Sequence, residues 1–308
     1  MVLARSNLVH SVGTALAKGA TIATRYSAVR RQSELIPGRP EPLIVEYQSQ
    51  QLKLFPQIAT AIAFILCGHQ VRQMYPSFTS QAKEGNYIAL PELHSTTAGL
   101  KAFATQRACE GLEVLRMACG GHGFSSASAF PEIYGIFAPS CTLEGENTVM
   151  LLQTARFLVK TVRQASKGGK LTPLMSYLKM DQSEHCNAKE PEDFMNIQTL
   201  LNAYRHRARR MVTHATSSLE ADLRGGLNNA IAWNKNHLHL LPASTNKLSF
   251  LQAHCHLFVL DTFNQAVENA VCEDATKRIL QALVQFYALD GIVENKGEFL
   301  EVCTFWES

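Results

Sequence analysis

The chain has 308 residues, of which 46% are hydrophobic and 18% are charged, and this composition is that of an ordinary globular protein with enough apolar side chains for a core. Its 29 basic and 26 acidic residues give a formal net charge of +3, which is too small to indicate binding to nucleic acid or to an anionic membrane. The longest apolar run, residues 58–67, is about half as long as a membrane-spanning helix requires. We therefore expect neither a nucleic-acid partner nor a transmembrane segment.

The eight cysteines include no pair at CxxC spacing, and in a chain of this length they indicate reduced thiols rather than a disulfide framework. The N-terminal residues show no long apolar core and no clear cleavage site, so we expect no secretory signal. The last three residues, 306–308, differ from the SKL-type peroxisomal address.

Apolar residues recur at helical spacing along most of the chain, and little in it is typical of a strand. A Pro-Gly-Arg-Pro sequence at residues 37–40 predicts a tight break between two antiparallel helices, and the polar residues 76–89 predict the end of the second. Gly120 and Gly121 end a third helix. We expect helices over residues 5–35, 44–75, 92–118, 142–164, 193–222, 245–270 and 274–291.

Two segments interrupt this helical pattern. Residues 120–141 hold several glycines, prolines and serines and predict a long ordered loop, which inside a compact domain is usually functional. Residues 166–190 contain glycine, lysine and serine and predict a linker. We therefore expect two helical modules, residues 1–165 and 191–308.

The segment Cys-Thr-Leu-Glu-Gly-Glu-Asn-Thr at residues 141–148 is a candidate catalytic site. The helix dipole favours acidic residues in a first turn, so Glu144 and Glu146 have an ordinary capping explanation. A carboxylate beside a glycine at a loop-to-helix junction can also enter a cavity, where apolar surroundings raise the pKa of a carboxyl and make it an effective general base. The residues alone leave both interpretations open.

Two other patterns suit an anionic ligand. Adjacent glycines at 120 and 121 let a ligand approach the backbone closely, although a helix end followed by a turn is the better explanation of this fragment alone. Arginine and glutamine within residues 25–32 and 46–51 suit a phosphate, although a solvated charged face is the usual explanation.

Two further patterns predict no site. His254 and His256 are two residues apart on a predicted helix and point in different directions, so we expect no metal. The basic run at residues 205–210 predicts a solvated helix face.

Several long motifs together resemble the peroxisomal acyl-CoA oxidases, and the resemblance covers nearly the whole chain. The motifs lie at residues 22–33, 90–101, 118–124, 139–150 and 152–160, and the likeness continues through residues 254–256 and 287–295. The resemblance implies an all-α fold, with an acyl-CoA dehydrogenase-type four-helix bundle over residues 1–165 and a truncated acyl-CoA oxidase C-terminal helical domain over residues 191–308. It also implies FAD as the cofactor, acyl-CoA and O2 as substrates, and a peroxisomal location.

The same resemblance assigns roles to individual residues. Glu144 matches the catalytic base, whose backbone N–H holds the thioester carbonyl together with a flavin hydroxyl, and Arg5 and Gly145 match the substrate site. Arg30 matches an arginine that reaches the flavin pyrophosphate across a dimer. The remaining cofactor contacts match Gln48, Gly120 and Gly121.

The implied reaction oxidises an acyl-CoA with O2 to a trans-2-enoyl-CoA and H2O2, with Glu144 removing the α-proton while the β-hydrogen leaves as hydride to the flavin. The resemblance begins where the second half of the family begins, without its N-terminal helical domain and β-domain. An alternative is therefore a catalytically incomplete, truncated isoform that acts as a helical dimerisation or regulatory module. We expect a homodimer or pairing with a full-length oxidase, and weak or no FAD binding by this chain alone.

Overall fold

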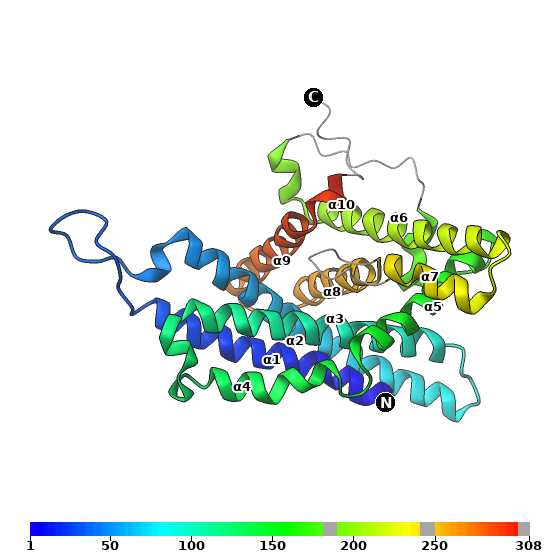
Figure 1. Ribbon diagram of the computed structural model, residues 1–308, viewed down its shortest axis with the longest axis horizontal. Coiled ribbons are helices and arrows are strands. Elements are labelled where there is room, and N and C mark those ends of the chain that lie inside the picture. Colours follow the sequence, from blue (N-terminus) through cyan, green and yellow to red (C-terminus); the bar gives the residue numbers. More distant parts are fainter. Residues whose placement is uncertain (181–189, 241–249, 301–308) are drawn as a thin grey trace.

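The computed structural model describes residues 1–180, 190–240 and 250–300, which form long helices with short connections (Figure 1). The first group comprises α1 (Val2–Ser27), α2 (Gln48–Lys83), α3 (Leu90–Ala118), α4 (Phe130–Phe137) and α5 (Asn147–Ser166). The second group comprises α6 (Ile197–Arg224), α7 (Asn229–Leu240), α8 (Phe250–Glu268), α9 (Asp274–Glu294) and α10 (Lys296–Leu300). Short 3-10 helices are η1 (Ile44–Glu46), η2 (Gly120–Phe124), η3 (Ser126–Ser128), η4 (Ala138–Cys141), η5 (Pro173–Lys179) and η6 (Pro191–Met195). The predicted all-α class is confirmed, since the described residues contain one isolated bridge, Arg31–Leu43, and no named strand.

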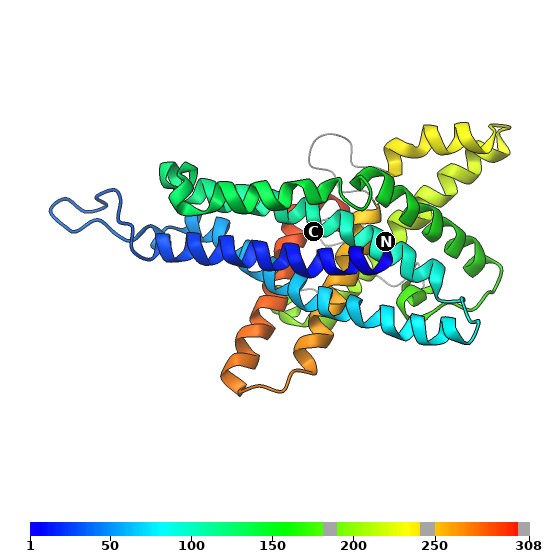
Figure 2. The ribbon, with the colours of Figure 1, turned by 90° about the horizontal axis from the view of Figure 1, so that it is seen from below.

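Helices α1, α2 and α3 lie side by side, with α4 returning along them toward the N-terminus of α1 (Figures 1 and 2). The approach of α1 to α2 depends on two glycines. A Cβ on Gly68 would lie 2.5 Å from the backbone nitrogen of His10, and a Cβ on Gly13 would lie 2.9 Å from that of Ile65. Any larger side chain at either position would push the two helix backbones apart.

The largest hydrophobic cluster is shared by both groups of helices. It joins Phe64 of α2 and Phe103 of α3 to Tyr204 of α6 and Phe263 of α8. Residues 166–180, which the sequence predicts as part of a linker, contribute to the same cluster, because η5 buries Tyr177 in it. The two groups of helices therefore share one continuous core. The predicted division into modules at residues 1–165 and 191–308 stays a prediction.

Three predicted boundaries were wrong. Helix α1 ends at Ser27 instead of residue 35. Helix α2 continues through Pro76 to Lys83, because exposed polar residues do not by themselves end a helix. In that extension the Ser77 and Thr79 hydroxyls donate hydrogen bonds to carbonyls of the same helix. The predicted loop at residues 120–141 contains α4, whose second residue is a proline, at a position where the missing N–H has no helical partner to lose.

The basic run at residues 205–210 is only partly solvated, contrary to the prediction. The Arg207 side chain is fully buried, with its guanidinium 2.5 Å from the Glu298 carboxylate and over the ring of Phe299. The two histidines of α8 contact different neighbours: Nδ1 of His254 lies 2.8 Å from the Tyr177 hydroxyl, whereas His256 packs against Phe103 and Tyr204.

Within the described ranges, no group of three or more His, Cys, Asp or Glu side chains could hold a metal ion. Among the same residues, α2 has the length and composition of a membrane-crossing helix, but 56% of its apolar window is buried inside the protein, as in the core helix of a globular fold.

Gly68→Ala tests the close contact of α1 and α2. Alanine favours helix by about 1 kcal/mol over glycine, yet we expect the free energy of unfolding to fall by about 2 kcal/mol, because the new methyl group meets the His10 backbone. Gly297→Ala in α10, where the added Cβ meets nothing within 4 Å, is the control and should not lower stability. Urea unfolding measures both, and equal effects would contradict the packing argument.

His254 should make stability depend on pH. Burial lowers its pKa from 6.5 to about 4, so the unfolded chain binds more protons than the folded chain between these values. Stability therefore falls as the pH is lowered from 6.5 to about 4, by about 3 kcal/mol from this group. Urea unfolding of the wild type and of His254→Gln at pH 7 and 4.5 should show a smaller acid loss in the variant, and an unchanged loss would be the contrary result.

Candidate functional site

Glu144 lies on a turn between η4 and α5, and not in the first turn of a helix as predicted. Helix α5 begins at Asn147 because Glu144 has a φ of 60° and Gly145 a φ of 113°, which are both incompatible with a right-handed helix. Glu146 is the residue that caps α5, and its carboxylate accepts a hydrogen bond from the Val149 N–H at 3.2 Å. Helix capping therefore accounts for Glu146 and does not account for Glu144.

The left-handed backbone of Glu144 costs about 1–3 kcal/mol in a residue with a Cβ. Two buried cations hold this turn. Arg5 of α1, which is 3% exposed, donates from Nε to the Glu144 carbonyl at 2.9 Å. Lys101 of α3 is 0% exposed and binds the residues on either side.

The Lys101 ammonium group donates three hydrogen bonds, which uses all of its protons. Its acceptors are the carbonyl of Cys141 at 3.0 Å, the carbonyl of Gly145 at 2.6 Å and Oδ1 of Asn147 at 2.8 Å. Asn147 in turn donates to the Thr105 hydroxyl at 3.1 Å. Burial lowers the pKa of Lys101, and the nearby acidic groups oppose that shift. One side chain thus fixes both ends of the turn to α3.

Two atoms of this site are enclosed without a partner. They are Oε2 of Glu144, whose residue is half-buried, and Nη1 of the buried Arg5. Buried polar atoms are almost always hydrogen-bonded, so an orphaned acceptor and an orphaned donor at one turn are typical of a place that receives a ligand. The carboxylate is thereby available to accept a proton.

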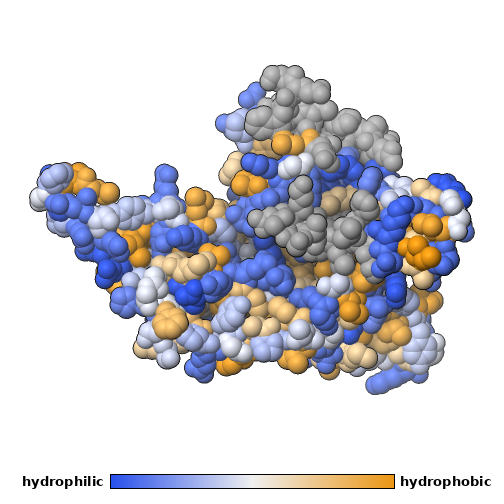
Figure 3. Space-filling view, in the orientation of Figure 1, coloured by the Kyte–Doolittle hydropathy of each residue, from blue (hydrophilic) through white to orange (hydrophobic). Residues whose placement is uncertain are grey.

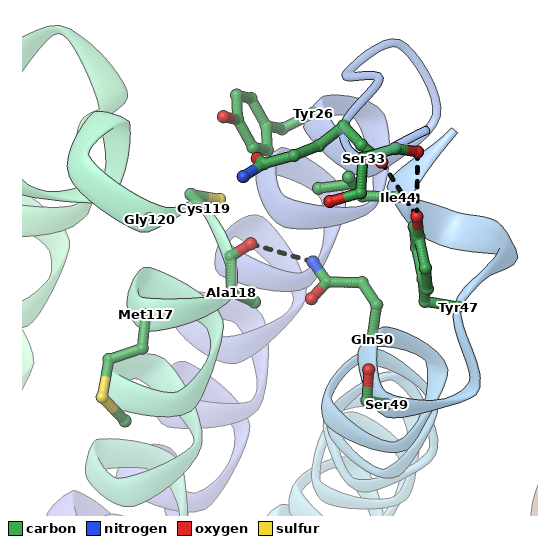
Figure 4. Close-up of a pocket in the computed structure, with 11 residues that line it drawn as sticks. Tyr26, Ser33, Ile44, Tyr47, Ser49, Gln50, Met117, Ala118, Cys119 and Gly120 are labelled. Atoms are coloured by element: carbon green, nitrogen blue, oxygen red, sulfur yellow. Dashed lines mark hydrogen bonds between the residues drawn. The ribbon is translucent and has the colours of Figure 1, made fainter. Parts of the chain in front are cut away.

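A second cluster lies around a cavity of about 280 Å³ at the other end of α1 (Figure 4). Gln50 is buried there, and its amide nitrogen donates to the Ala118 carbonyl at 2.8 Å and to the Ser27 hydroxyl at 2.9 Å. The Tyr47 hydroxyl donates to the Gln32 carbonyl at 2.9 Å from the opposite side. These bonds join the C-terminal ends of α1 and α3 to the beginning of α2.

Of the predicted cofactor contacts, Gly120 lines this cavity. It has a φ of 56°, and neither it nor Gly121 has any atom within 4 Å of the place where a Cβ would stand. Arg30 is exposed beside the cavity, and its carbonyl accepts a hydrogen bond from Ile44. Gln48 is exposed at the start of α2 and is not among the residues that line the cavity.

The two clusters are far apart on the same helices. Arg5 and Ser27 are 22 residues apart on α1, and at about 1.5 Å per residue this is roughly 33 Å. The structure therefore brings Glu144, Gly145 and Arg5 together at one end and places the glycine pair, Gln50 and Arg30 at the other.

Lys101 and Gln50 were not identified as site residues from the sequence, although both carried a signal. Each polar residue occupies an apolar stripe: Lys101 follows Ala98 and precedes Ala108 at helical spacing, and Gln50 precedes Leu54 in the same way. A long polar side chain inside such a stripe must find partners in the core.

Family models support the resemblance that the motifs carry. The model for the acyl-CoA oxidase C-alpha1 domain matches residues 1–159, and the model described as acyl-CoA oxidase matches residues 196–307. The chain belongs to the acyl-CoA oxidase family. The segment between the two matches includes η5, through which this oxidase chain packs Tyr177 against His254.

Individual relatives agree with this membership. The chain is 42% identical over 307 residues to peroxisomal acyl-coenzyme A oxidase 1 of Homo sapiens, covering 98% of this chain and 45% of that protein. It is 37% identical over 302 residues to acyl-coenzyme A oxidase 1 of Drosophila melanogaster, covering 97% and 44%. The chain thus spans less than half the length of the relatives it matches.

Solved structures share the fold. Acyl-CoA oxidase 1 of Arabidopsis thaliana superposes with a TM-score of 0.90 at 32% identity, over 98% of this chain and 44% of that one. Acyl-CoA oxidase-2 of Caenorhabditis elegans, bound with FAD, ascaroside-CoA and ATP, superposes with a TM-score of 0.91 at 34% identity, over 99% and 44%. The helical arrangement of the oxidase chain is therefore that of its family.

Lys101→Met tests the ammonium group that holds the turn. The variant keeps most of the side-chain volume but leaves the Gly145 and Cys141 carbonyls without their donor, so we expect the free energy of unfolding to fall by about 2–4 kcal/mol. Hydrogen exchange of the amides of residues 142–148 should also accelerate more than in the rest of the chain.

The matched control is Lys53→Met, which removes an exposed lysine of α2 and should change stability by no more than about 0.5 kcal/mol. If Lys101→Met unfolded at the same urea concentration as the wild type, with unchanged exchange in residues 142–148, the ammonium group would not hold the turn.

Proposed function

We propose that this chain supplies the catalytic base and part of the cofactor contacts of an FAD-dependent, peroxisomal acyl-CoA oxidase, which converts an acyl-CoA and O2 to a trans-2-enoyl-CoA and H2O2. The observation that carries the proposal is the Glu144 turn, in which two buried cations bind the backbone while a carboxylate oxygen stays enclosed and unpaired. The membership of the acyl-CoA oxidase family supports it.

Glu144 accepts the α-proton of the bound thioester in this mechanism. Its own backbone N–H donates to the thioester carbonyl, and this stabilises the negative charge that develops as the α-carbon loses its proton. Arg5 and Lys101 donate hydrogen bonds to the carbonyl oxygens of the turn. The partial negative charges of these oxygens are therefore directed at the two cations and not at the substrate. Gly145, at a φ of 113°, lets the chain turn sharply beside the reacting carboxylate.

The cavity at the other end of α1 fits part of a flavin dinucleotide. The open space at the glycine pair lets a ligand approach the backbone closely. Arg30 is exposed and can pair with a pyrophosphate. Gln50, rather than Gln48, is the glutamine fixed at the cavity wall. FAD supplies the two-electron redox chemistry when it is bound.

The separation of the two clusters supports a complete site that is built from more than one chain. The end of α1 beside Glu144 and the end beside Gly120 are roughly 33 Å apart, and we infer that they serve two different cofactor molecules in a dimer. Exposed apolar side chains near α4 and the turn, Tyr134, Ile136, Leu143 and Val149, suit contact with another protein surface. Figure 3 shows apolar residues among polar ones along the lower edge, where Figure 1 draws α4.

The alternative function is a helical pairing module, which the exposed apolar side chains near α4 and the turn would also suit. In that case the chain would associate with a full-length oxidase through these surfaces and would make no product alone. The two functions differ in one measurable property, the release of peroxide from an acyl-CoA by the purified protein.

Glu144→Gln tests the base assignment. Removing the proton acceptor while keeping the shape should lower the rate of peroxide release from an acyl-CoA by about 10²–10⁴-fold. Glu146→Gln is the matched control: it weakens the α5 cap by about 1 kcal/mol and should leave most activity. Full activity in the Glu144 variant would remove Glu144 from the mechanism. Wild-type protein that releases no peroxide, yet co-purifies with a full-length oxidase, would support the pairing module instead.

A further inference from the structure

Two cysteines meet beside the Glu144 turn. Cys109 lies on α3 and Cys141 ends η4, and their Sγ atoms are 3.7 Å apart although 32 positions separate them in the sequence. Both are free thiols. The proposed reaction uses neither of them, and Cys141 is only three residues before Glu144.

The pair is accessible to a small molecule from one side. Both cysteines line a cavity of about 430 Å³, with Glu110 of α3 and Tyr134 of α4 on its walls. Cys141 is partly exposed and Cys109 is 8% exposed. A molecule the size of hydrogen peroxide, little larger than water at about 30 Å³, fits this cavity easily. In contrast, Cys67 and Cys255 are fully enclosed in the core.

The two thiols have different environments, which gives them different chemical roles. The hydrogen bond between the two thiols lowers the pKa of Cys141 and outweighs the effect of burial, which raises it, and the positive charge of Lys101 lowers it further. The same hydrogen bond, then burial, raises the pKa of Cys109, and the charge of Glu110 adds to this. Cys141 is therefore the thiol that carries the thiolate, the nucleophilic form.

We propose that Cys109 and Cys141 form a peroxide-oxidisable dithiol, in which Cys141 reacts first and Cys109 then closes a disulfide. The Cys141 thiolate attacks one oxygen of hydrogen peroxide, so that an S–O bond forms, the O–O bond breaks and hydroxide leaves, taking a proton to become water. The Cys109 sulfur then attacks the Cys141 sulfenic acid, an S–S bond forms, and the second oxygen leaves as water with the Cys109 proton. Two thiols are oxidised and one peroxide is reduced to two waters.

The Cys109–Cys141 disulfide would join α3 to the segment that positions Glu144. Lys101 already binds the Cys141 carbonyl from the same helix, so a covalent link at Cys141 acts on the turn that carries Glu144. Reagent peroxide is sufficient for the reaction, and the chemistry of the pair stands whether or not the chain itself has oxidase activity.

The experiment exposes the full chain to hydrogen peroxide, blocks free thiols by alkylation at intervals and identifies cysteine-containing peptides by mass spectrometry. The expected result is a linked Cys109–Cys141 peptide lighter by two hydrogens, formed before the exposed Cys272 is appreciably oxidised. Oxidation of Cys272 with no linked peptide would overturn the proposal, as would linkage of Cys109 or Cys141 mainly to other cysteines.

Two serine variants test the order of the steps. In Cys109→Ser, Cys141 should stop at the sulfenic acid and be trapped by dimedone, because the resolving thiol is gone. In Cys141→Ser, loss of the Cys109 thiol should slow by at least about tenfold, because Cys109 is the protonated and buried member of the pair. Equal rates in the wild type and in Cys141→Ser would overturn the assigned order. Urea unfolding of each variant checks that both fold as the wild type does.

Discussion

The Glu144 turn depends above all on the buried ammonium group of Lys101. Taking a lysine side chain out of water is costly unless every proton finds an acceptor, and Lys101 satisfies this condition with two carbonyls and one amide oxygen of residues 141–147. The turn cannot shift without breaking these bonds, so the position of the carboxylate follows the position of α3. Arg5 adds the same kind of bond from α1 and ties the turn to a second helix.

This arrangement makes the position of Glu144 a consequence of helix packing. Helix α1 is held against α2 at Gly13 and Gly68, and the other end of the same bundle is joined through Gln50 to Ser27 and Ala118. Rigid helices thus hold the two clusters at a fixed separation of roughly 33 Å. This fixed separation is the physical basis of the proposal that the clusters belong to two different sites of an assembly.

Helical periodicity in the sequence was sufficient to predict the all-helical class and most of the long helices, because apolar stripes repeat at the helical period. The errors arose where tertiary contacts decide the outcome. The polar residues 76–83 stay helical because exposing polar side chains to water costs no free energy. The left-handed backbone of Glu144 is held in place by hydrogen bonds from Arg5 and Lys101 to the turn. Local sequence contains neither fact.

The site was predictable to the extent that motifs define it. Glu144, Gly145 and Arg5 were named from a resemblance, and the structure places them together; their roles stay predictions. Buried Lys101, Gln50 and Arg207 were missed because a polar side chain on an apolar stripe looks the same in a sequence whether it is solvated or paired in the core. Only their partners, which lie 23 to 91 positions away, distinguish the two cases.

The most direct test of the account is the release of peroxide, with FAD supplied in excess, by dimers assembled from two different variants of this chain, one with Glu144→Gln and one with Arg30→Ala. If each chain gives its base to one site and its cofactor contact to the other, one site of the mixed dimer keeps both groups. The mixture should then release clearly more peroxide than either variant alone. A mixture no more active than its parents would contradict the division of each site between two chains.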